Sequence, residues 1–167
     1  IVNNTDIPDD KKVKALKIIY NASGANGMIG GQVVDVESAG NAISKERLDF
    51  IYELKTSALI ESSMMIGAIL AGADEKEIKD IELIAKNVGV AFQIQDDILD
   101  VWGDPETFGK AVGGDISCNK KTFVYLEAMG RLGDEAKDLE MWYSQVMEDN
   151  TEKIAAVKAI FELPGVR

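Results

Sequence analysis

FQIQDDILD, residues 92–100, is the most informative stretch of this sequence. It carries Asp96, Asp97 and Asp100 at helical spacing within an otherwise apolar segment. At about 100° per residue, these carboxylates share one broad face with Gln93. Like charges at this spacing repel by about 0.2–0.5 kcal/mol per pair unless a cation lies between them. Oxygen-only ligands favour magnesium, manganese or calcium over zinc, so the stretch predicts a divalent-metal site.

The segment around this stretch predicts one long helix. Asp74 and Glu77 form a capping box at its start. Apolar residues then recur every three to four positions and predict a core-facing stripe, with the carboxylates opposite. The stripe contains Ile78, Ile81, Ile84, Val88, Phe92, Leu99 and Trp102, with Gln95 on the same side. A solvated acidic surface is the alternative interpretation, because any amphipathic helix carries polar residues opposite its apolar stripe.

Composition indicates a globular chain and narrows its partners. The 167 residues are 46% hydrophobic and 28% charged, which suits a folded domain with a sizeable core. A net charge of −11 makes nucleic acid or an anionic membrane an unsuitable partner, because both require a basic surface. Histidine is absent from the sequence, so the usual general base is missing.

Cysteine and hydropathy patterns favour a reducing compartment without membrane insertion. Cys118 is the single cysteine, so an intrachain disulfide is excluded and the cytoplasm is the expected location. Polar or charged residues interrupt the apolar runs before they reach membrane-spanning length, and the first ten residues do not resemble a targeting signal. We therefore expect no stable membrane insertion.

The remaining sequence predicts helices almost throughout, in a single all-α domain over residues 1–167. Turn and capping signals separate the expected helices. These cover 8–22, 27–38, 44–71, 121–130, 134–148 and 151–163, and a glycine-containing loop covers 103–119.

Lys55 is a second candidate site residue because it falls within an apolar stripe of the expected helix 44–71. Leu48, Ile51, Leu59 and Ile66 lie within about 40° of it on a helical projection. A buried lysine needs an anion or a water-filled cleft. Either Lys55 lines a cleft and is directed at phosphate, or it pairs with a core carboxylate or extends outward to solvent.

The loop after the acidic stretch is a third candidate site feature. Lys110 follows Gly109, and Lys120 and Lys121 lie close behind Gly113 and Gly114. Lysine beside glycine suits phosphate binding, because the ammonium acts as a point charge and glycine permits close backbone approach. The spacing does not match a Walker loop, and lysines in a solvated loop are the alternative interpretation.

Several ordered motifs resemble one family closely. The stretches are GMIGGQVVDV at 27–36, LKTSALI at 54–60, FQIQDDILDVWGD at 92–104, GK at 109–110 and GDISCNKKT at 114–122. Together they are similar to the trans-isoprenyl diphosphate synthases of short-chain farnesyl or geranylgeranyl type. FQIQDDILD resembles the second aspartate-rich motif of that family. The resemblance implies an antiparallel all-helical bundle of the isoprenoid synthase type, of which this chain matches the second half.

The resemblance also implies the chemistry and its residues. Magnesium or manganese would assist ionisation of an allylic diphosphate, and isopentenyl diphosphate would attack the resulting cation to give a longer trans-polyprenyl diphosphate. By analogy, Asp96, Asp97 and Asp100 bind metal, and Thr56 and Gln93 offer oxygens to the cation. Lys55, Lys110 and Lys120 hold the leaving diphosphate. Gln32 and Asp35 line the same cavity.

The departures from the family pattern keep alternatives open. The first aspartate-rich motif and most cationic residues for isopentenyl diphosphate are absent from these residues, as are the amino-terminal helices that carry them. Tyr52 stands where many members have histidine. A non-catalytic helical partner of a prenyl synthase is therefore one alternative, and a terpene cyclase is another. The resemblance implies a homodimer, and the sequence does not indicate product chain length.

Overall fold

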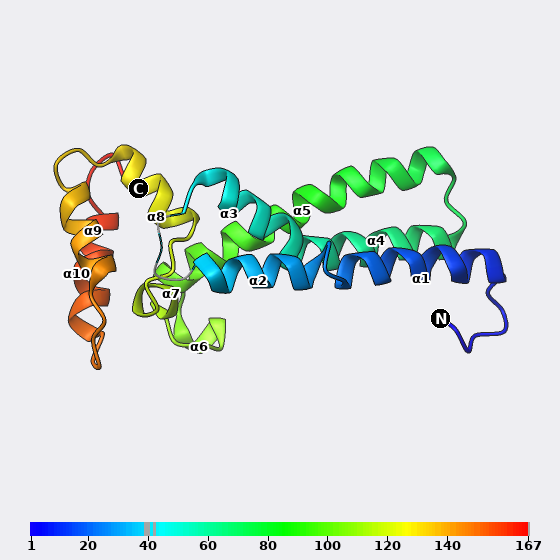
Figure 1. Ribbon diagram of the computed structural model, residues 1–167, viewed down its shortest axis with the longest axis horizontal. Coiled ribbons are helices and arrows are strands. Elements are labelled where there is room, and N and C mark those ends of the chain that lie inside the picture. Colours follow the sequence, from blue (N-terminus) through cyan, green and yellow to red (C-terminus); the bar gives the residue numbers. More distant parts are fainter. Residues whose placement is uncertain (39–40, 42, 167) are drawn as a thin grey trace. The chain divides into compact units, whose positions relative to one another are not determined.

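The computed structural model describes residues 1–38, 41 and 43–166, and within them every regular element is helical (Figure 1). The first part of the chain forms α1 (Asp9–Ser23), α2 (Met28–Ser38), α3 (Lys45–Tyr52), the π-helical turn η1 (Glu53–Ser57) and α4 (Ala58–Ala71). The rest forms α5 (Glu75–Trp102), α6 (Pro105–Phe108), α7 (Gly114–Ser117), α8 (Phe123–Arg131), α9 (Ala136–Ser144) and α10 (Thr151–Phe161). The all-α prediction is confirmed for the described residues.

The predicted capping signals are present in the structure. At the start of α5, the Asp74 amide donates to Glu77 Oε2 at 2.8 Å, and the Glu77 amide donates to Asp74 Oδ1 at 2.9 Å. These reciprocal bonds satisfy two amides at the helix start. Before α3, the Arg47 amide donates to Ser44 Oγ at 3.3 Å. The helix boundaries therefore follow local side-chain chemistry that is legible in the sequence.

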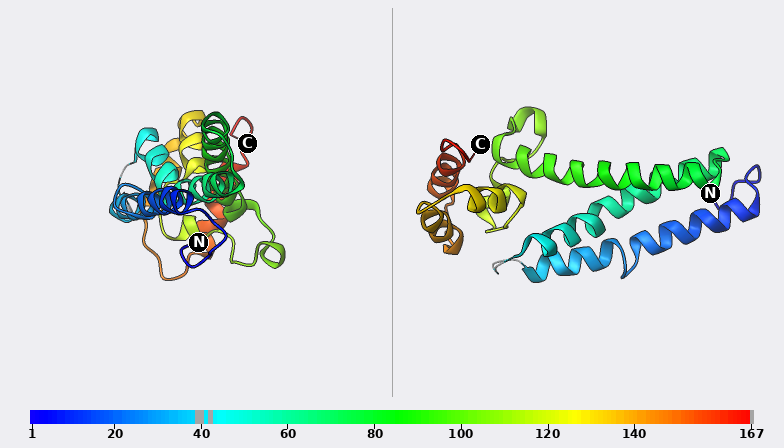
Figure 2. Two further views of the ribbon diagram at one scale, coloured as in Figure 1. Left: turned by 90° about the vertical axis from the view of Figure 1, so that its right-hand side faces the viewer. Right: turned by 90° about the horizontal axis from the view of Figure 1, so that it is seen from above.

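The chain divides into two compact units, each with its own packing. Residues 1–36 and 49–93 form unit 1, and residues 37–48 and 94–167 form unit 2. In unit 1, α1 packs beside α4 (Figure 2), and the buried apolar side chains include Ala15, Ile69 and Ala85. The expectation of a single domain over residues 1–167 stays a prediction.

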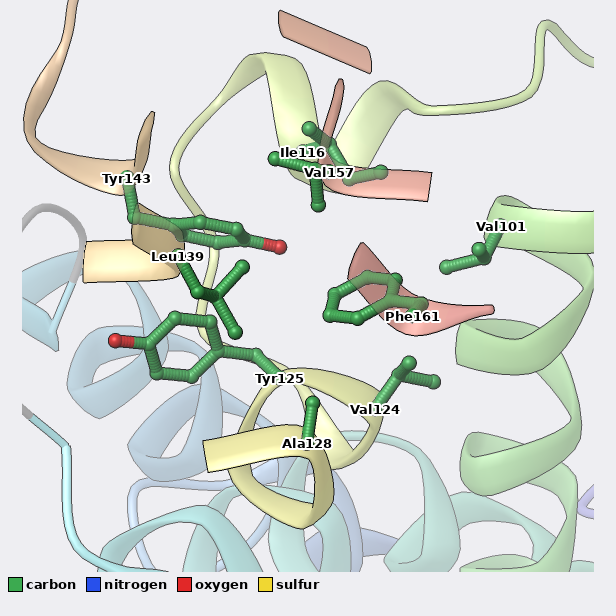
Figure 3. Packing of buried hydrophobic residues seen from close by; sticks show 9 residues of the cluster. All are labelled: Val101, Ile116, Val124, Tyr125, Ala128, Leu139, Tyr143, Val157 and Phe161. Atoms are coloured by element: carbon green, nitrogen blue, oxygen red, sulfur yellow. The ribbon is translucent and has the colours of Figure 1, made fainter. Parts of the chain in front are cut away.

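Unit 2 contains a continuous hydrophobic core. Tyr125 and Tyr143 pack with ring centroids 4.4 Å apart, and Leu139, Val157 and Phe161 are almost completely buried beside them (Figure 3). These side chains come from α8, α9 and α10. Burial of a side chain of this size contributes about 1.5–3 kcal/mol, so this core fixes the scaffold on which the loop after α5 is held.

The prediction that the apolar stripe of α5 faces the core was wrong for the middle of the helix. Ile84, Val88 and Phe92 are 46–55% exposed, and Gln95 is also exposed. The buried positions of the helix instead include Asp97 and Asp100, which were expected on the face opposite the apolar stripe. The periodicity correctly located an apolar stripe but could not show whether this chain covers it.

Two further details differ from the sequence-based expectation. The loop predicted over 103–119 contains the one-turn helices α6 and α7. The segment Lys45–Ala71 is long and apolar enough to cross a membrane by length and composition. Core helices of globular proteins meet the same criterion, and its α4 portion packs against α1. The expectation that this chain does not insert into membranes stays a prediction.

Candidate active site

In unit 1, a π-helical turn presents Lys55 and Thr56. The turn η1 interrupts the helix from α3 to α4, and such interruptions occur frequently at functional sites. Two glycines allow neighbouring helices to approach it closely. A Cβ on Gly31 would lie 2.5 Å from the Lys55 backbone nitrogen, and a Cβ on Gly89 would lie 2.5 Å from Ser57 Cβ. Helices α2 and α5 therefore pack directly against the turn.

Lys55 pairs with Asp35 in the structure. Its Nζ atom lies 2.5 Å from Asp35 Oδ2, and both side chains are partly buried. The structure thus brings together two predicted substrate-binding residues. It also realises one of the interpretations left open by the sequence, in which Lys55 has a carboxylate partner. A half-buried charge of this kind is retained only when such a partner or water compensates it.

The other predicted residues of unit 1 lie on the same elements. Gln32 is exposed on α2, three residues before Asp35 and therefore on the same side of the helix. Thr56 follows Lys55 on η1, and Gln93 lies on α5. Thr56 and Gln93 are both partly exposed.

In unit 2, Asp96 is the accessible carboxylate of the acidic stretch. Its side chain is 44% exposed, and the Nζ atom of Lys110 lies 3.2 Å from each carboxylate oxygen. Lys110 is similarly exposed, so this ion pair is open to water and to exchange of partners. The structure therefore joins the predicted metal ligand and the predicted diphosphate-binding lysine.

Asp97 and Asp100 occupy a different environment. They are 3% and 5% exposed, respectively. Asp97 Oδ2 accepts a bond from the Phe123 amide at 3.1 Å, and Asp100 Oδ2 accepts one from the Asp115 amide at 3.0 Å. The segment 115–123 contains Lys120. Through these two hydrogen bonds, the carboxylates of α5 hold both ends of that segment.

Burial raises the pKa of Asp100 above its ordinary value. The amides of Asp115 and Gly114 favour the charged carboxylate and oppose this effect, whereas the Asp115 carboxylate reinforces it. Asp115 also lies 3.3 Å from the Nζ atom of Lys120. The positive charge of Lys110 also lowers the pKa of Asp100, so the negative charge in this region is balanced locally by amides and by Lys110 and Lys120.

The residues fit a magnesium ion bound together with a diphosphate. Magnesium in proteins commonly takes one or two carboxylates and completes its shell with water and phosphate oxygens, and Asp96 offers such a carboxylate. Among the described residues, no three acidic, histidine or cysteine side chains gather into a ligand set. Asp97 and Asp100 stay predicted ligands, direct or through water.

The sequence placed Asp115 and Asn119 in the loop motif but did not predict their contacts, and it did not single out Lys153. Asp115 pairs with Lys120, and the ammonium of Lys153 donates to Asn119 Oδ1. A signal for Lys153 existed, because Val157 and Phe161 follow at i+4 and i+8 and predict a buried face. A cavity of about 580 Å³ in unit 1 is lined by other residues of α1, η1, α4 and α5 and by none of the predicted site residues.

Fold and site together define an all-helical protein with one accessible and one partly buried ion pair between a lysine and an aspartate. Residues 3–162 match the family model described as Polyprenyl synthetase, and the chain belongs to this family. The chain is 37% identical over 121 residues to the farnesyl diphosphate synthase of Bacillus subtilis (strain 168), covering 72% of this chain and 41% of that protein.

Solved structures agree with this assignment. A crystal structure of geranylgeranyl pyrophosphate synthase aligns with a TM-score of 0.86 and 39% identity over 96% of this chain and 50% of that one. The Corynebacterium glutamicum geranylgeranyl pyrophosphate synthase, complexed with isoprenyl diphosphate and magnesium, gives a TM-score of 0.75 and 30% identity over 91% of this chain and 44% of that one. The isoprenoid synthase fold is confirmed, and the chain spans about half the length of the relatives it matches.

Proposed function

We propose that this chain is part of a trans-prenyltransferase that joins isopentenyl diphosphate to an allylic diphosphate. The observation that carries the proposal is the open ion pair of Asp96 with Lys110, located in the motif that resembles the second aspartate-rich motif of the family. An accessible carboxylate suits a metal ion, and an exchangeable lysine beside it suits a phosphate oxygen. The farnesyl and geranylgeranyl diphosphate synthases among the relatives support the same reaction class.

The reaction is a substitution at carbon. The carbon–oxygen bond of the allylic diphosphate breaks, and pyrophosphate leaves with the bonding electron pair. The double bond of isopentenyl diphosphate then supplies two electrons to the allylic cation and forms the new carbon–carbon bond. Loss of a proton restores a double bond. The products are one longer diphosphate, pyrophosphate and a proton.

The residues of this chain contribute binding, charge and orientation. A magnesium ion held by Asp96, with Asp97 and Asp100 directly or through water, would stabilise negative charge on the departing diphosphate. Lys110 shares both Asp96 oxygens in the structure and would turn toward a phosphate oxygen once a cation occupies that carboxylate. Lys55 and Lys120 would add positive charge at the diphosphate.

The carbon skeleton of the substrate would be guided by the polar side chains of unit 1. Thr56 and Gln93 present oxygens that favour positive charge on the allylic carbons. Gln32 and Asp35 line the approach from α2, and Asp35 controls Lys55 through their ion pair. None of these tasks needs a histidine, in agreement with the composition.

The complete activity requires more than the residues of this chain. The relatives are about twice as long, and the first aspartate-rich motif expected for the family is absent from this sequence. We propose that an amino-terminal half, in the same polypeptide or in a partner, completes the site. We also propose a homodimer as the assembled form and the cytoplasm as its location, the latter supported by the single cysteine.

A prenyl-transfer assay tests the proposal. The complete polypeptide and the 167-residue chain are each incubated with magnesium, labelled isopentenyl diphosphate and dimethylallyl, geranyl or farnesyl diphosphate. We expect the complete polypeptide to form a longer labelled diphosphate. Release of a hydrocarbon from a single substrate would indicate a cyclase instead. Absence of both products, with stimulation of a separate synthase, would indicate a non-catalytic partner.

A further inference from the structure

Lys153 has an environment that hydrophobic packing does not explain. It lies on α10, and its side chain is 0% exposed within unit 2. The ammonium donates to Asn119 Oδ1 and, at 3.0 Å, to the backbone carbonyl of Gln145. It also lies 6.0 Å from the ring centroid of Tyr143. A buried ammonium is thus held by neutral oxygens and an aromatic face.

Asn119, Lys153 and the carbonyl of Gln145 together form a clamp of three hydrogen bonds. The side-chain amide of Asn119 donates to the same Gln145 carbonyl at 3.0 Å, so three polar groups form a closed triangle of hydrogen bonds. The Asn119 backbone has φ = 56°, in the left-handed region that non-glycine residues rarely adopt. Such a conformation persists where surrounding contacts determine it. The triangle acts together with two backbone hydrogen bonds, from the Asn119 amide to the Ile116 carbonyl at 3.1 Å and from the Lys120 amide to the Asp115 carbonyl at 2.9 Å, to fix the direction of the chain at residue 119.

The next residue is Lys120, whose ammonium lies 3.3 Å from Asp115 Oδ1. The backbone amide of Asp115 is in turn bonded to Asp100 on α5. Lys120 is consequently held between the Asn119 turn and the acidic stretch. We propose that Lys153 is a positioning residue that, through Asn119, directs Lys120 toward the diphosphate. This inference rests on the proposed function, in which Lys120 contacts that group.

The chemistry of Lys153 supports a positioning role over simple packing. Burial lowers its pKa, so the charged form is costly to maintain inside unit 2. A hydrophobic residue of similar volume commonly stabilises a core better than a buried charge. Three directed donor hydrogens, in contrast, can hold an amide oxygen and a carbonyl at fixed positions.

Hydrogen exchange of the full chain tests the clamp itself. In Lys153→Met, we expect the amides of residues 114–122 to exchange at least tenfold faster while the other amides of unit 2 keep their protection. Asn119→Gly should reproduce the effect, because glycine accepts φ = 56° without strain and removes only the side-chain link. Lys158→Met is the matched control on the same helix and should leave these amides unchanged.

Binding of inorganic pyrophosphate with magnesium tests whether the clamp acts through Lys120. By calorimetry on the complete polypeptide, Lys120→Ala should raise the dissociation constant about tenfold, because it removes one charge-assisted contact. Lys153→Met should raise it several-fold alone and produce no further rise in the Lys120→Ala background. A general loss of structure would instead weaken binding by the same factor in both backgrounds.

Each outcome has a distinct meaning. Unchanged exchange at residues 114–122 in both Lys153→Met and Asn119→Gly would overturn the clamp, and multiplicative losses in the double variant would overturn its action through Lys120. No effect of Lys120→Ala on pyrophosphate would overturn the role of Lys120 and with it this inference. Absence of prenyl transfer despite pyrophosphate binding would contradict the proposed reaction while leaving the positioning role standing.

Discussion

Asp96 and Asp97 are neighbours in sequence but have different environments. Adjacent residues on a helix point about 100° apart, so one carboxylate can face solvent while the other faces the interior. Asp96 is open and shared with Lys110, whereas Asp97 is buried and bonded to the Phe123 amide. The first is therefore suited to a ligand, and the second holds the backbone of the following segment.

Asp96→Ala in the complete polypeptide should lower prenyl-transfer turnover about 10³-fold, because it would remove the metal contact that we propose acts on the developing charge. The free energy of unfolding should change by less than about 0.5 kcal/mol, because the side chain is half exposed. Steady-state kinetics and urea unfolding give both quantities. Asp80→Ala, at an exposed position of the same helix, is the control and should be neutral. Near-normal turnover of Asp96→Ala would remove this residue from the metal site.

The ion pair of Lys55 with Asp35 predicts how substitution of Lys55 changes the free energy of unfolding. Lys55→Met should lower the free energy of unfolding by about 1–3 kcal/mol, because Asp35 is left partly buried without its cation. The double variant Lys55→Met/Asp35→Asn should recover most of this loss. Urea unfolding of the four proteins of the cycle measures the coupling. Equal stability of Lys55→Met and the unsubstituted chain would contradict a structural contribution of the pair.

At the level of elements, Gly31 and Gly89 pack so closely against η1 that neither position has room for a Cβ atom. A methyl group on Gly89 would meet Ser57 at 2.5 Å, whereas a methyl group on Gly67 of α4 would have no neighbour within 4 Å. Gly89→Ala should therefore cost about 1–3 kcal/mol through overpacking. Gly67→Ala should stabilise α4 by about 0.5–1 kcal/mol through helix propensity. Thermal unfolding compares them, and a neutral Gly89→Ala would show that α5 can move away from η1.

Glu61 on α4 provides a pH prediction. Burial raises its pKa, and the carboxylates of Glu82 and Glu53 raise it further, although Lys86 opposes them. The folded chain then holds this proton more tightly than the unfolded chain, so the contribution of Glu61 to stability falls as pH rises above about 4.5. Glu61→Gln should be more stable than the unsubstituted chain at pH 7, with the difference disappearing below about pH 4. A constant difference across urea unfolding curves from about pH 3.5 to 7 would contradict the raised pKa.

The elements show which features the sequence could predict. Local signals were sufficient for two helix starts: Asp74 with Glu77 located the start of α5, and Ser44 located the start of α3. The structure shows Lys110 paired with Asp96, whereas the predicted role of Lys110 at a diphosphate stays a prediction. The π-helical turn and the buried Lys153 depend on contacts between distant segments, such as Gly31 against Lys55 and Asn119 against Lys153. Helical periodicity contains no information about such contacts.

At the level of the whole molecule, the apolar stripe of α5 is exposed to solvent over three large side chains. Ile84, Val88 and Phe92 repeat at i, i+4 and i+8 and therefore lie along one side of the helix. The chain spans about half the length of its relatives, and we propose that the amino-terminal half proposed above covers this stripe. The sequence pattern correctly located the apolar stripe, and each of these side chains is 46–55% exposed in the structure.

Replacing Ile84, Val88 and Phe92 by glutamine distinguishes a covered stripe from a solvated one. In the 167-residue chain, the triple variant should change the free energy of unfolding by less than about 1 kcal/mol, because these side chains are already about half exposed. In the complete polypeptide it should cost roughly 1.5–3 kcal/mol per residue, because burial then removes each apolar side chain from water. Val146→Gln, at a fully exposed position of unit 2, should be neutral in both proteins.

The triple variant has to be compared in both proteins, because a change in the free energy of unfolding of one protein alone could reflect helix propensity. Isoleucine, valine and phenylalanine have slightly lower helix propensity than glutamine, so propensity predicts a small stabilisation in both proteins. Coverage by an amino-terminal half predicts a large loss in the complete polypeptide only, together with loss of prenyl transfer. Equal and small effects in both proteins, with activity retained, would mean that the stripe stays in water and that the missing half of the site is supplied elsewhere.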